Sequence, residues 1–391
     1  MGERIVLEDF NHFGGKHCWT TSLRNAFAYH DLELSEEMVF GLGGGLGFIY
    51  WYQKQMPAPL VGGRYGKKYD PLENSCKRIG GNATLAYTTS AKKGYNQLKE
   101  LLREGEPAVT FVDMYYLRYM VLPEEAHFGA HTILVYGLDE DEDRVYVSDR
   151  SVKPLSMTIE DLMKARNSKY KPWPPMNMLV KIEYPTEVAD LSNGIRDSIR
   201  ESTGMMLHPP IKNIGLAGMQ KWASLVTKWP RDFKGLALFN CLFNVFIYIE
   251  IGGTGGSSFR PMYAQFLDEA SEILDEAELR EIADIFRESG KIWSKIARIA
   301  LPDSWDSLRR IRELSMEKSR IFEEQGPNGY ERMKEIAAEV DDHLIKELVT
   351  KEFQELDERK IAPILENMKE KILELYEIEK HAFKRLNAVI S

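Results

Sequence analysis

The sequence predicts an α+β protein, with a mixed N-terminal domain over residues 1–185 and an all-helical C-terminal domain over residues 186–391. Runs rich in β-branched and aromatic residues occur at residues 107–113, 131–137, 144–148 and 177–184, and none follows Pro185. Beyond this proline, apolar residues recur at steps of three and four, the period of an amphipathic helix. One such series is Ile361, Leu365, Met368, Ile372 and Leu375.

Glycine and proline divide the C-terminal region into separate helices. Breaks are predicted at residues 209–210, 230, 252–258, 302 and 326–327. The pattern is typical of several antiparallel helices. The last helix is long and rich in Lys and Glu, which is typical of a bundle helix with one solvated face and would also permit a homodimer contact.

Composition restricts the classes of function. The net charge of −9 argues against a nucleic-acid-binding surface as the main role. The first ten residues lack a continuous apolar run, so we expect no signal peptide. The most apolar stretch, residues 236–251, contains Asn240, Asn244 and Glu250 and is short for a membrane span, so it predicts a buried helix. We therefore expect a cytoplasmic protein without a membrane-bound part.

The three cysteines, Cys18, Cys76 and Cys241, lie far apart and form no C-x-x-C pair, which argues against a disulfide framework or a zinc ribbon. Cys18 stands out because two glycines precede it and Leu23, Ala26 and Phe27 follow at helical spacing. This pattern predicts a thiol at the N-terminus of a helix, where unpaired N–H groups and the helix dipole favour the thiolate. Cys18 is therefore a candidate nucleophile.

A predicted β-hairpin supplies the other two candidate catalytic residues. Residues 131–137 and 144–148 flank an acidic turn at residues 139–143. Alternation places His131 and Asp149 on the faces that are otherwise apolar, directly opposed or one diagonal step apart. A carboxylate at that distance fixes the tautomer of an imidazole base and supports the imidazolium. A structural His–Asp hydrogen bond is the alternative.

Three segments resemble the butirosin biosynthesis protein H family: residues 17–25 (HCWTTSLRN), 35–48 (SEEMVFGLGGGLGF) and 253–263 (GTGGSSFRPMY). The resemblance covers both halves of the chain. It implies a papain-like, C39-peptidase-like N-terminal domain and a helical C-terminal domain. It also implies an acyltransferase that moves an acyl or aminoacyl group from a thioester of a carrier protein or pantetheine to a small amine, with Cys18 as the acylated nucleophile, His131 as the base and Asp149 as its orienting group.

The sequence offers two candidate side chains for the donor that would stabilise the oxyanion. Papain-like enzymes place a glutamine several residues before the cysteine, and this sequence has none there. Asn11 or His12 could replace it, beside the backbone N–H of Cys18.

Two glycine-rich segments are candidate substrate-binding elements. Residues 41–47 fit no G-x-G-x-x-G frame, and Gly43, Gly44 and Gly45 predict either a tight turn or a backbone nest for an anion. The second segment, residues 252–260, has more glycines than a helix break needs. Its candidate contacts for a substrate or anion are Thr254, Ser257 and Arg260, while Glu250 could pair with Arg260 or bind a substrate amine.

We expect no metal and no cofactor, because His127 would lie in the loop before the strand that begins at His131, not on one helix face with it. His30, His208, His343 and His381 have no evident partners and are expected at the surface. Acyl transfer is the leading interpretation. Hydrolysis by the same residues, as in a peptidase or amidase, and a non-catalytic binding module of the same fold are the alternatives.

Overall fold

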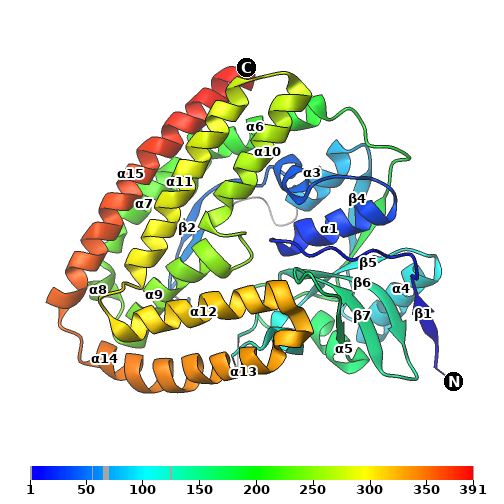
Figure 1. Ribbon diagram of the computed structural model, residues 1–391, viewed down its shortest axis with the longest axis horizontal. Coiled ribbons are helices and arrows are strands. Elements are labelled where there is room, and N and C mark those ends of the chain that lie inside the picture. Colours follow the sequence, from blue (N-terminus) through cyan, green and yellow to red (C-terminus); the bar gives the residue numbers. More distant parts are fainter. Residues whose placement is uncertain (1, 55, 65–69, 124–125, 391) are drawn as a thin grey trace. The chain divides into compact units, whose positions relative to one another are not determined.

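The computed structural model describes residues 2–54, 56–64, 70–123 and 126–390 (Figure 1). The chain forms two compact units. The first, here called the sheet unit, comprises Met1–Val39, Ile79–Ala189 and Glu317–Ala338. The second, the helical unit, comprises Phe40–Arg78, Asp190–Met316 and Glu339–Ser391. The expected boundary at residue 185 lies close to the junction after Ala189, but each unit also takes one segment from the other half of the sequence.

The sheet unit is built on one antiparallel sheet of seven strands in the order β4-β9-β5-β6-β7-β8, with β1 paired to β6. This sheet and the helices of the chain confirm the predicted α+β class. The strands are β1 (Arg4–Val6), β4 (Asn82–Ala86), β5 (Ala108–Val112), β6 (His131–Asp139), β7 (Arg144–Ser148), β8 (Leu155–Met157) and β9 (Leu179–Glu183).

The predicted hairpin is present as β6 and β7. Leu134 pairs with Ser148 and Val135 with Val147, and the register shifts at a bulge between Val135 and Gly137. The acidic turn is closed by the Asp139 side chain, which accepts hydrogen bonds from the N–H groups of residues 141 and 142. The hairpin follows from period-two alternation of apolar residues, the pattern that predicted it.

Helices cover both faces of this sheet. Helix α1 (Cys18–Tyr29) lies against one face, and α4 (Ala91–Arg103) and α5 (Ile159–Asn167) against the other (Figure 1). The Ser90 side chain caps the first turn of α4. Arg166, buried in α5, donates to the Thr110 hydroxyl of β5 and to the Gly94 carbonyl of α4. The remaining short helices are η1 (Met114–Tyr116), η2 (Arg118–Met120), η5 (Gly326–Gly329) and α13 (Tyr330–Ala338).

Every element that the structure describes after β9 is a helix, as the periodicity predicts. The helices of this region that lie in the helical unit are α6 (Leu191–Leu207), α7 (Gly215–Val226), α8 (Trp229–Asp232), α9 (Leu236–Phe246), η3 (Ile247–Ile251), η4 (Ser257–Phe259), α10 (Arg260–Leu274), α11 (Glu278–Ala300), η6 (Glu339–Val349), α14 (Thr350–Gln354) and α15 (Glu358–Ile390). Helix α12 (Asp306–Gln325) runs from the helical unit into the sheet unit. The predicted breaks at residues 209–210, 302 and 326–327 all separate helices.

The helical unit also takes in residues from the first half of the chain. Helix α2 (Glu36–Leu42) leads into it, and it contains a two-stranded sheet of β2 (Ile49–Trp51) and β3 (Leu60–Gly62) and the helix α3 (Asp70–Arg78). Strands of three residues are too short for period-two alternation to reveal, so the sequence did not predict them. Phe48, just before β2, lies against Trp222 and Trp293 in the core of this unit.

The apolar stretch at residues 236–251 forms α9 and the π-helical turn η3, and Cys241 within it is buried, as expected. None of the helices in the described ranges has the length and apolar character needed to cross a membrane.

Candidate active site

Cys18 is the first residue of α1, as the sequence predicts. His17 before it is extended, with φ −127° and ψ 133°. The first N–H groups of a helix have no partner within the helix, and together with the helix dipole they favour a negative charge at this position. Cys18 is partly exposed, while Cys76 and Cys241 are buried. Of the three thiols, Cys18 is therefore the accessible one.

The loop before Cys18 packs closely against α1 and α2. The Asn25 side chain bonds the N–H and the carbonyl of Phe13. A Cβ atom at Gly15 would lie 2.2 Å from Thr21 Oγ1 and 2.7 Å from Glu36 Oε2. Only glycine fits this position, which explains why a glycine leads into the helix.

A buried carboxylate holds the same loop. Glu36 accepts hydrogen bonds from the backbone N–H groups of Lys16 and His17 and from the hydroxyls of Thr20 and Thr21. It is 5% exposed. Four donors converge on one side chain, so Glu36 fixes the backbone immediately before Cys18.

The hairpin brings His131 and Asp149 together. His131 Nε2 lies 2.8 Å from Asp149 Oδ2, and both residues are buried. Extending the β6–β7 register by one residue places Asp149 opposite Ile133, one diagonal step from His131. Since Nε2 is taken by Asp149, Nδ1 is the ring nitrogen left for Cys18.

The three groups shift one another's pKa values. Burial opposes the Cys18 thiolate, but the charge of His131 and its hydrogen bond outweigh this and lower the pKa of Cys18 to about 7. Burial likewise opposes the His131 imidazolium, but Asp149 and Cys18 raise the pKa of His131 to about 9. The pKa of Asp149 is lowered, because the charge of His131 outweighs its burial. The arrangement therefore favours a thiolate–imidazolium pair near neutral pH.

The two candidate oxyanion donors differ in their surroundings. Both ring nitrogens of His12 are in use: Nδ1 lies 2.7 Å from Ser148 Oγ and Nε2 lies 2.7 Å from the Ser151 carbonyl. Burial lowers the pKa of His12, so the ring is neutral, with Nε2–H donating to the carbonyl. The expectation that His12 could donate to an oxyanion is therefore wrong, because its one N–H is already bonded. Asn11 is exposed and stays a candidate.

The first glycine-rich segment is a buried turn in the helical unit. Gly44 has φ +69°, its N–H donates to the Gly41 carbonyl, and the Gly45 N–H donates to the Phe40 carbonyl. These are the two bonds of a Schellman motif at the end of α2. A Cβ atom at Gly45 would lie 2.5 Å from the Phe40 carbonyl oxygen. This favours the tight turn, and the predicted anion nest at Gly43, Gly44 and Gly45 is wrong, because the segment is buried and the N–H groups of Gly44 and Gly45 already have partners.

Arg260 is a structural residue. It is wholly buried, and its guanidinium forms a bidentate ion pair with Glu379 of α15 at 2.7 and 2.8 Å. Its remaining N–H groups donate to the carbonyls of Gly47, Gly63 and Ser258. The expected contact of Arg260 with substrate is therefore wrong. Arg260 instead joins the two glycine-rich segments within the helical unit.

Two other candidates in the second segment also have hydrogen-bond partners within the protein. Thr254 is buried and donates to the Ile249 carbonyl, and Ser257 Oγ lies 2.8 Å from Ser294 Oγ. The expected role of Thr254 in substrate binding is wrong for the same reason as that of Arg260. Arg260 pairs with Glu379 and not with Glu250, whose Oε2 accepts a long hydrogen bond of 3.5 Å from the Ser257 N–H. Glu250 stays a candidate for binding an amine.

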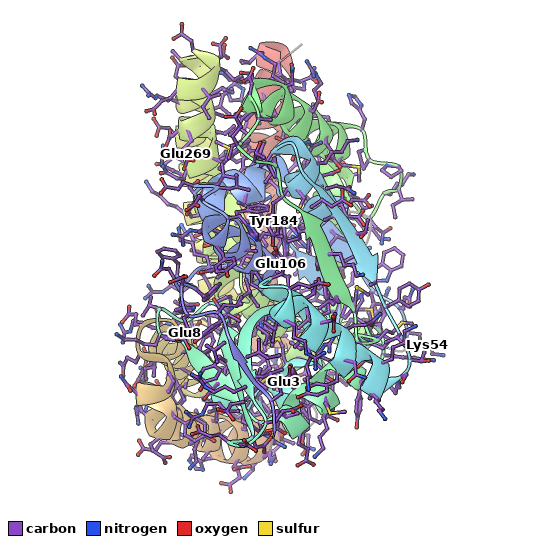
Figure 2. The ribbon with its side chains drawn as sticks, turned by 90° about the vertical axis from the view of Figure 1, so that its right-hand side faces the viewer. Glu3, Glu8, Lys54, Glu106, Tyr184 and Glu269 are labelled. Carbon is purple, nitrogen blue, oxygen red and sulfur yellow. The ribbon has the colours of Figure 1, made fainter. Side chains whose placement is uncertain are left out.

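Three of the other histidines, His30, His127 and His343, have partners that the sequence did not reveal. His127 lies in the loop before β6, as expected, and its Nδ1 is 2.7 Å from Asp113 Oδ2. His30 Nε2 lies 2.8 Å from Glu106, and its ring stacks on Tyr184. Glu106 and Tyr184 lie close together in Figure 2. The expectation that His30 has no partner is wrong, because both partners come from distant segments. It is also wrong for His343, whose Nδ1 lies 3.0 Å from Glu347 Oε2, four residues further along η6.

Sequence reasoning missed three residues that bind the side chains or backbone described above: Glu36, Glu379 and Tyr119. The Tyr119 hydroxyl donates to Asp149 Oδ2 at 3.2 Å. Each is an ordinary residue of a helix or turn, and its partner is distant in sequence or identified only by the fold. No local pattern in the sequence marks them.

Comparison with known families agrees with this description. Residues 17–150 match the family model of butirosin biosynthesis protein H, N-terminal. Residues 160–325 match a domain of unknown function, DUF4872. No curated protein matches the sequence. The first match begins one residue before Cys18 and ends one residue after Asp149, so it contains all three candidate catalytic residues. Over residues 17–150 the chain is therefore similar to the butirosin biosynthesis protein H family.

Proposed function

We propose that the protein is a cysteine-dependent acyltransferase that moves an acyl group from a thioester of pantetheine or a carrier protein to a small amine. The observation that carries the proposal is the partly exposed Cys18 at the N-terminus of α1, coupled to a buried His131–Asp149 pair. The match of residues 17–150 to a biosynthesis family supports an enzyme-like biosynthetic role.

In the first step, the Cys18 thiolate attacks the carbonyl carbon of the thioester. The oxyanion that forms is stabilised by the backbone N–H of Cys18 at the helix N-terminus. The carbon–sulfur bond of the donor then breaks, and the departing thiolate takes the proton of the His131 imidazolium. The acyl group is left on Cys18 as a new thioester.

In the second step, the amine nitrogen attacks this carbonyl carbon. His131, now neutral, accepts a proton from the amine, and Asp149 supports the imidazolium that forms. The bond to Cys18 breaks, which restores the thiolate and releases an amide. Asn11, which belongs to the sheet unit together with Cys18, stays a candidate donor to the oxyanion.

The proposal is tested by the intact mass of wild type and Cys18→Ala after mixing with a panel of acyl-pantetheine thioesters. A mass gain of one acyl group on wild type alone is expected. Adding primary amines should then discharge the adduct to an amide. Discharge to the free acid at the same rate with and without amines would instead indicate a hydrolase. The absence of any adduct, together with slow alkylation of Cys18 by iodoacetamide at neutral pH, would contradict the proposal and favour a binding module.

A further inference from the structure

The carboxylate of Asp149 receives three hydrogen bonds. Its Oδ2 lies 2.8 Å from His131 Nε2 and 3.2 Å from the Tyr119 hydroxyl. Its Oδ1 accepts from the Arg150 N–H at 2.7 Å. All four residues are buried. His131 and Tyr119 therefore share one oxygen atom of the group that orients the candidate base.

Tyr119 is the donor in its hydrogen bond. An ionised carboxylate only accepts hydrogen bonds, so the phenol must give its proton to the contact. Burial and the charge of Asp149 raise the pKa of Tyr119 well above its usual value, so the phenol stays neutral. Each donor that an acceptor oxygen receives disperses part of its charge, and Tyr119 thereby weakens the pull of Asp149 on His131.

The last turns of α12 hold Tyr119 in place. The rings of Tyr119 and Phe322 are stacked, with centroids 6.2 Å apart and planes inclined by 6°. The Arg150 guanidinium lies over the Phe322 ring, 5.3 Å from its centroid, and pairs with Glu323 at 3.2 Å. One segment of α12 thus contacts two of the residues that donate to Asp149.

Backbone contacts fix the same segment on both sides. The Val152 N–H donates to the Glu323 carbonyl at 2.7 Å, and the Lys318 ammonium donates to the Val121 carbonyl. The segment comes from a distant part of the chain but belongs to the sheet unit. The position of the Tyr119 hydroxyl is therefore set by packing and by main-chain bonds.

We propose that Tyr119 is a positioning residue for His131: its hydroxyl holds Asp149 Oδ2, weakens the bond from Asp149 to the imidazole, and is itself placed by Phe322. The inference rests on the proposed function, because it assigns Tyr119 a role through Asp149 and His131. Its consequence concerns the second step, in which His131 must be neutral to accept a proton from the amine.

The charged and titratable groups that face this pair are Cys18 from α1, Arg150 after β7, His12 from the N-terminal loop, and Tyr119 from η2. Of these, only Tyr119 can lose its hydrogen bond to Asp149 by a substitution that keeps both the ring and the net charge. Tyr119→Phe is therefore the informative variant.

The test is a titration of His131 by NMR in protein with isotope-labelled histidine. In Tyr119→Phe the pKa of His131 should rise by roughly 0.5 to 1 unit, since a hydrogen bond to a charged group is removed. The matched control, Tyr116→Phe, changes a tyrosine of the same loop whose ring lies beside His127, and should leave the pKa unchanged. Site-specific 3-fluorotyrosine at position 119, a stronger donor, should shift the pKa downward.

Opposite shifts from the two changes at position 119 would support the inference. An unchanged pKa of His131 in both would overturn it. The fluorotyrosine protein keeps the whole side chain, so it decides the question even if Tyr119→Phe fails to fold. The titration needs no acyl donor. Failure of the proposed function would appear separately, as the absence of an acyl adduct on wild type.

Discussion

The Glu36 carboxylate accepts the backbone N–H of His17 at 2.9 Å, one residue before the candidate nucleophile. The same side chain accepts the N–H of Lys16 and two threonine hydroxyls. Glu36 comes from α2, and the bond therefore joins the start of α1 to a second helix.

Glu36→Gln should destabilise the sheet unit by about 2 to 3 kcal/mol and slow the alkylation of Cys18. The amide nitrogen replaces Oε2, which accepts from the Lys16 N–H, and the uncharged amide oxygen accepts the bonds of Oε1 more weakly than a carboxylate does. Urea unfolding followed by fluorescence measures the first effect. Glu37→Gln is the matched control, because Glu37 pairs only with the exposed end of Lys16 in the described structure. Equal effects of the two substitutions would contradict the role given to Glu36.

Asp149→Asn should raise the pKa of Cys18. Without the carboxylate charge the pKa of His131 falls, the imidazolium is lost near neutral pH, and the thiolate loses the opposite charge that stabilises it. A shift of the thiol from about 7 towards its usual value should slow alkylation by iodoacetamide at pH 7 by roughly tenfold or more. Glu142→Gln, in the exposed turn of the same hairpin, should leave the rate unchanged. A wild-type rate in Asp149→Asn would show that the pair is only structural.

The rate of acylation should have a bell-shaped dependence on pH. Cys18 has a lowered pKa of about 7, so the thiolate forms as the pH rises through that value. His131 has a raised pKa of about 9, so the imidazolium that protonates the leaving thiolate disappears above that value. Formation of the acyl-enzyme, followed by mass against pH, should be fastest between the two. A rate that only rises with pH to beyond 9 would indicate an uncoupled thiol.

The sequence predicted the parts of the site that rest on local periodicity. Cys18 starts a helical repeat, His131 begins one alternating strand, and Asp149 directly follows the other. Their placement therefore needs only the regular geometry of a helix and a hairpin. The sequence did not reveal the partner of Arg260, because Glu379 lies 119 residues away in an amphipathic helix whose other charges are solvated.

Glycine-rich segments resemble ligand sites in a sequence for a related reason. Glycine is favoured where φ is positive and needed where another segment approaches too closely for a Cβ atom. The sequence does not say whether that neighbour is a ligand or the protein itself. At Gly41 the neighbour is the Phe266 ring, 2.1 Å from the position of a Cβ atom, and at Gly63 it is Ser258 Oγ, at 2.0 Å. Only the fold distinguishes such packing contacts from a substrate.

The buried ion pair of the helical unit gives the last prediction. Arg260→Met should lower the free energy of unfolding of this unit by about 3 to 5 kcal/mol, since it leaves Glu379 charged and buried with only Ser289 and Trp293 as donors. The double variant Arg260→Met with Glu379→Leu should cost less than the sum of the two single changes, because it removes both charges together.

Urea unfolding of the four proteins of this cycle measures the coupling. The folded fraction of Arg260→Met should still form the acyl adduct on Cys18 at the wild-type rate, as expected for a residue without exposed surface. If Arg260→Met kept its stability but lost acyl transfer, Arg260 would be a substrate-binding residue and not a structural one.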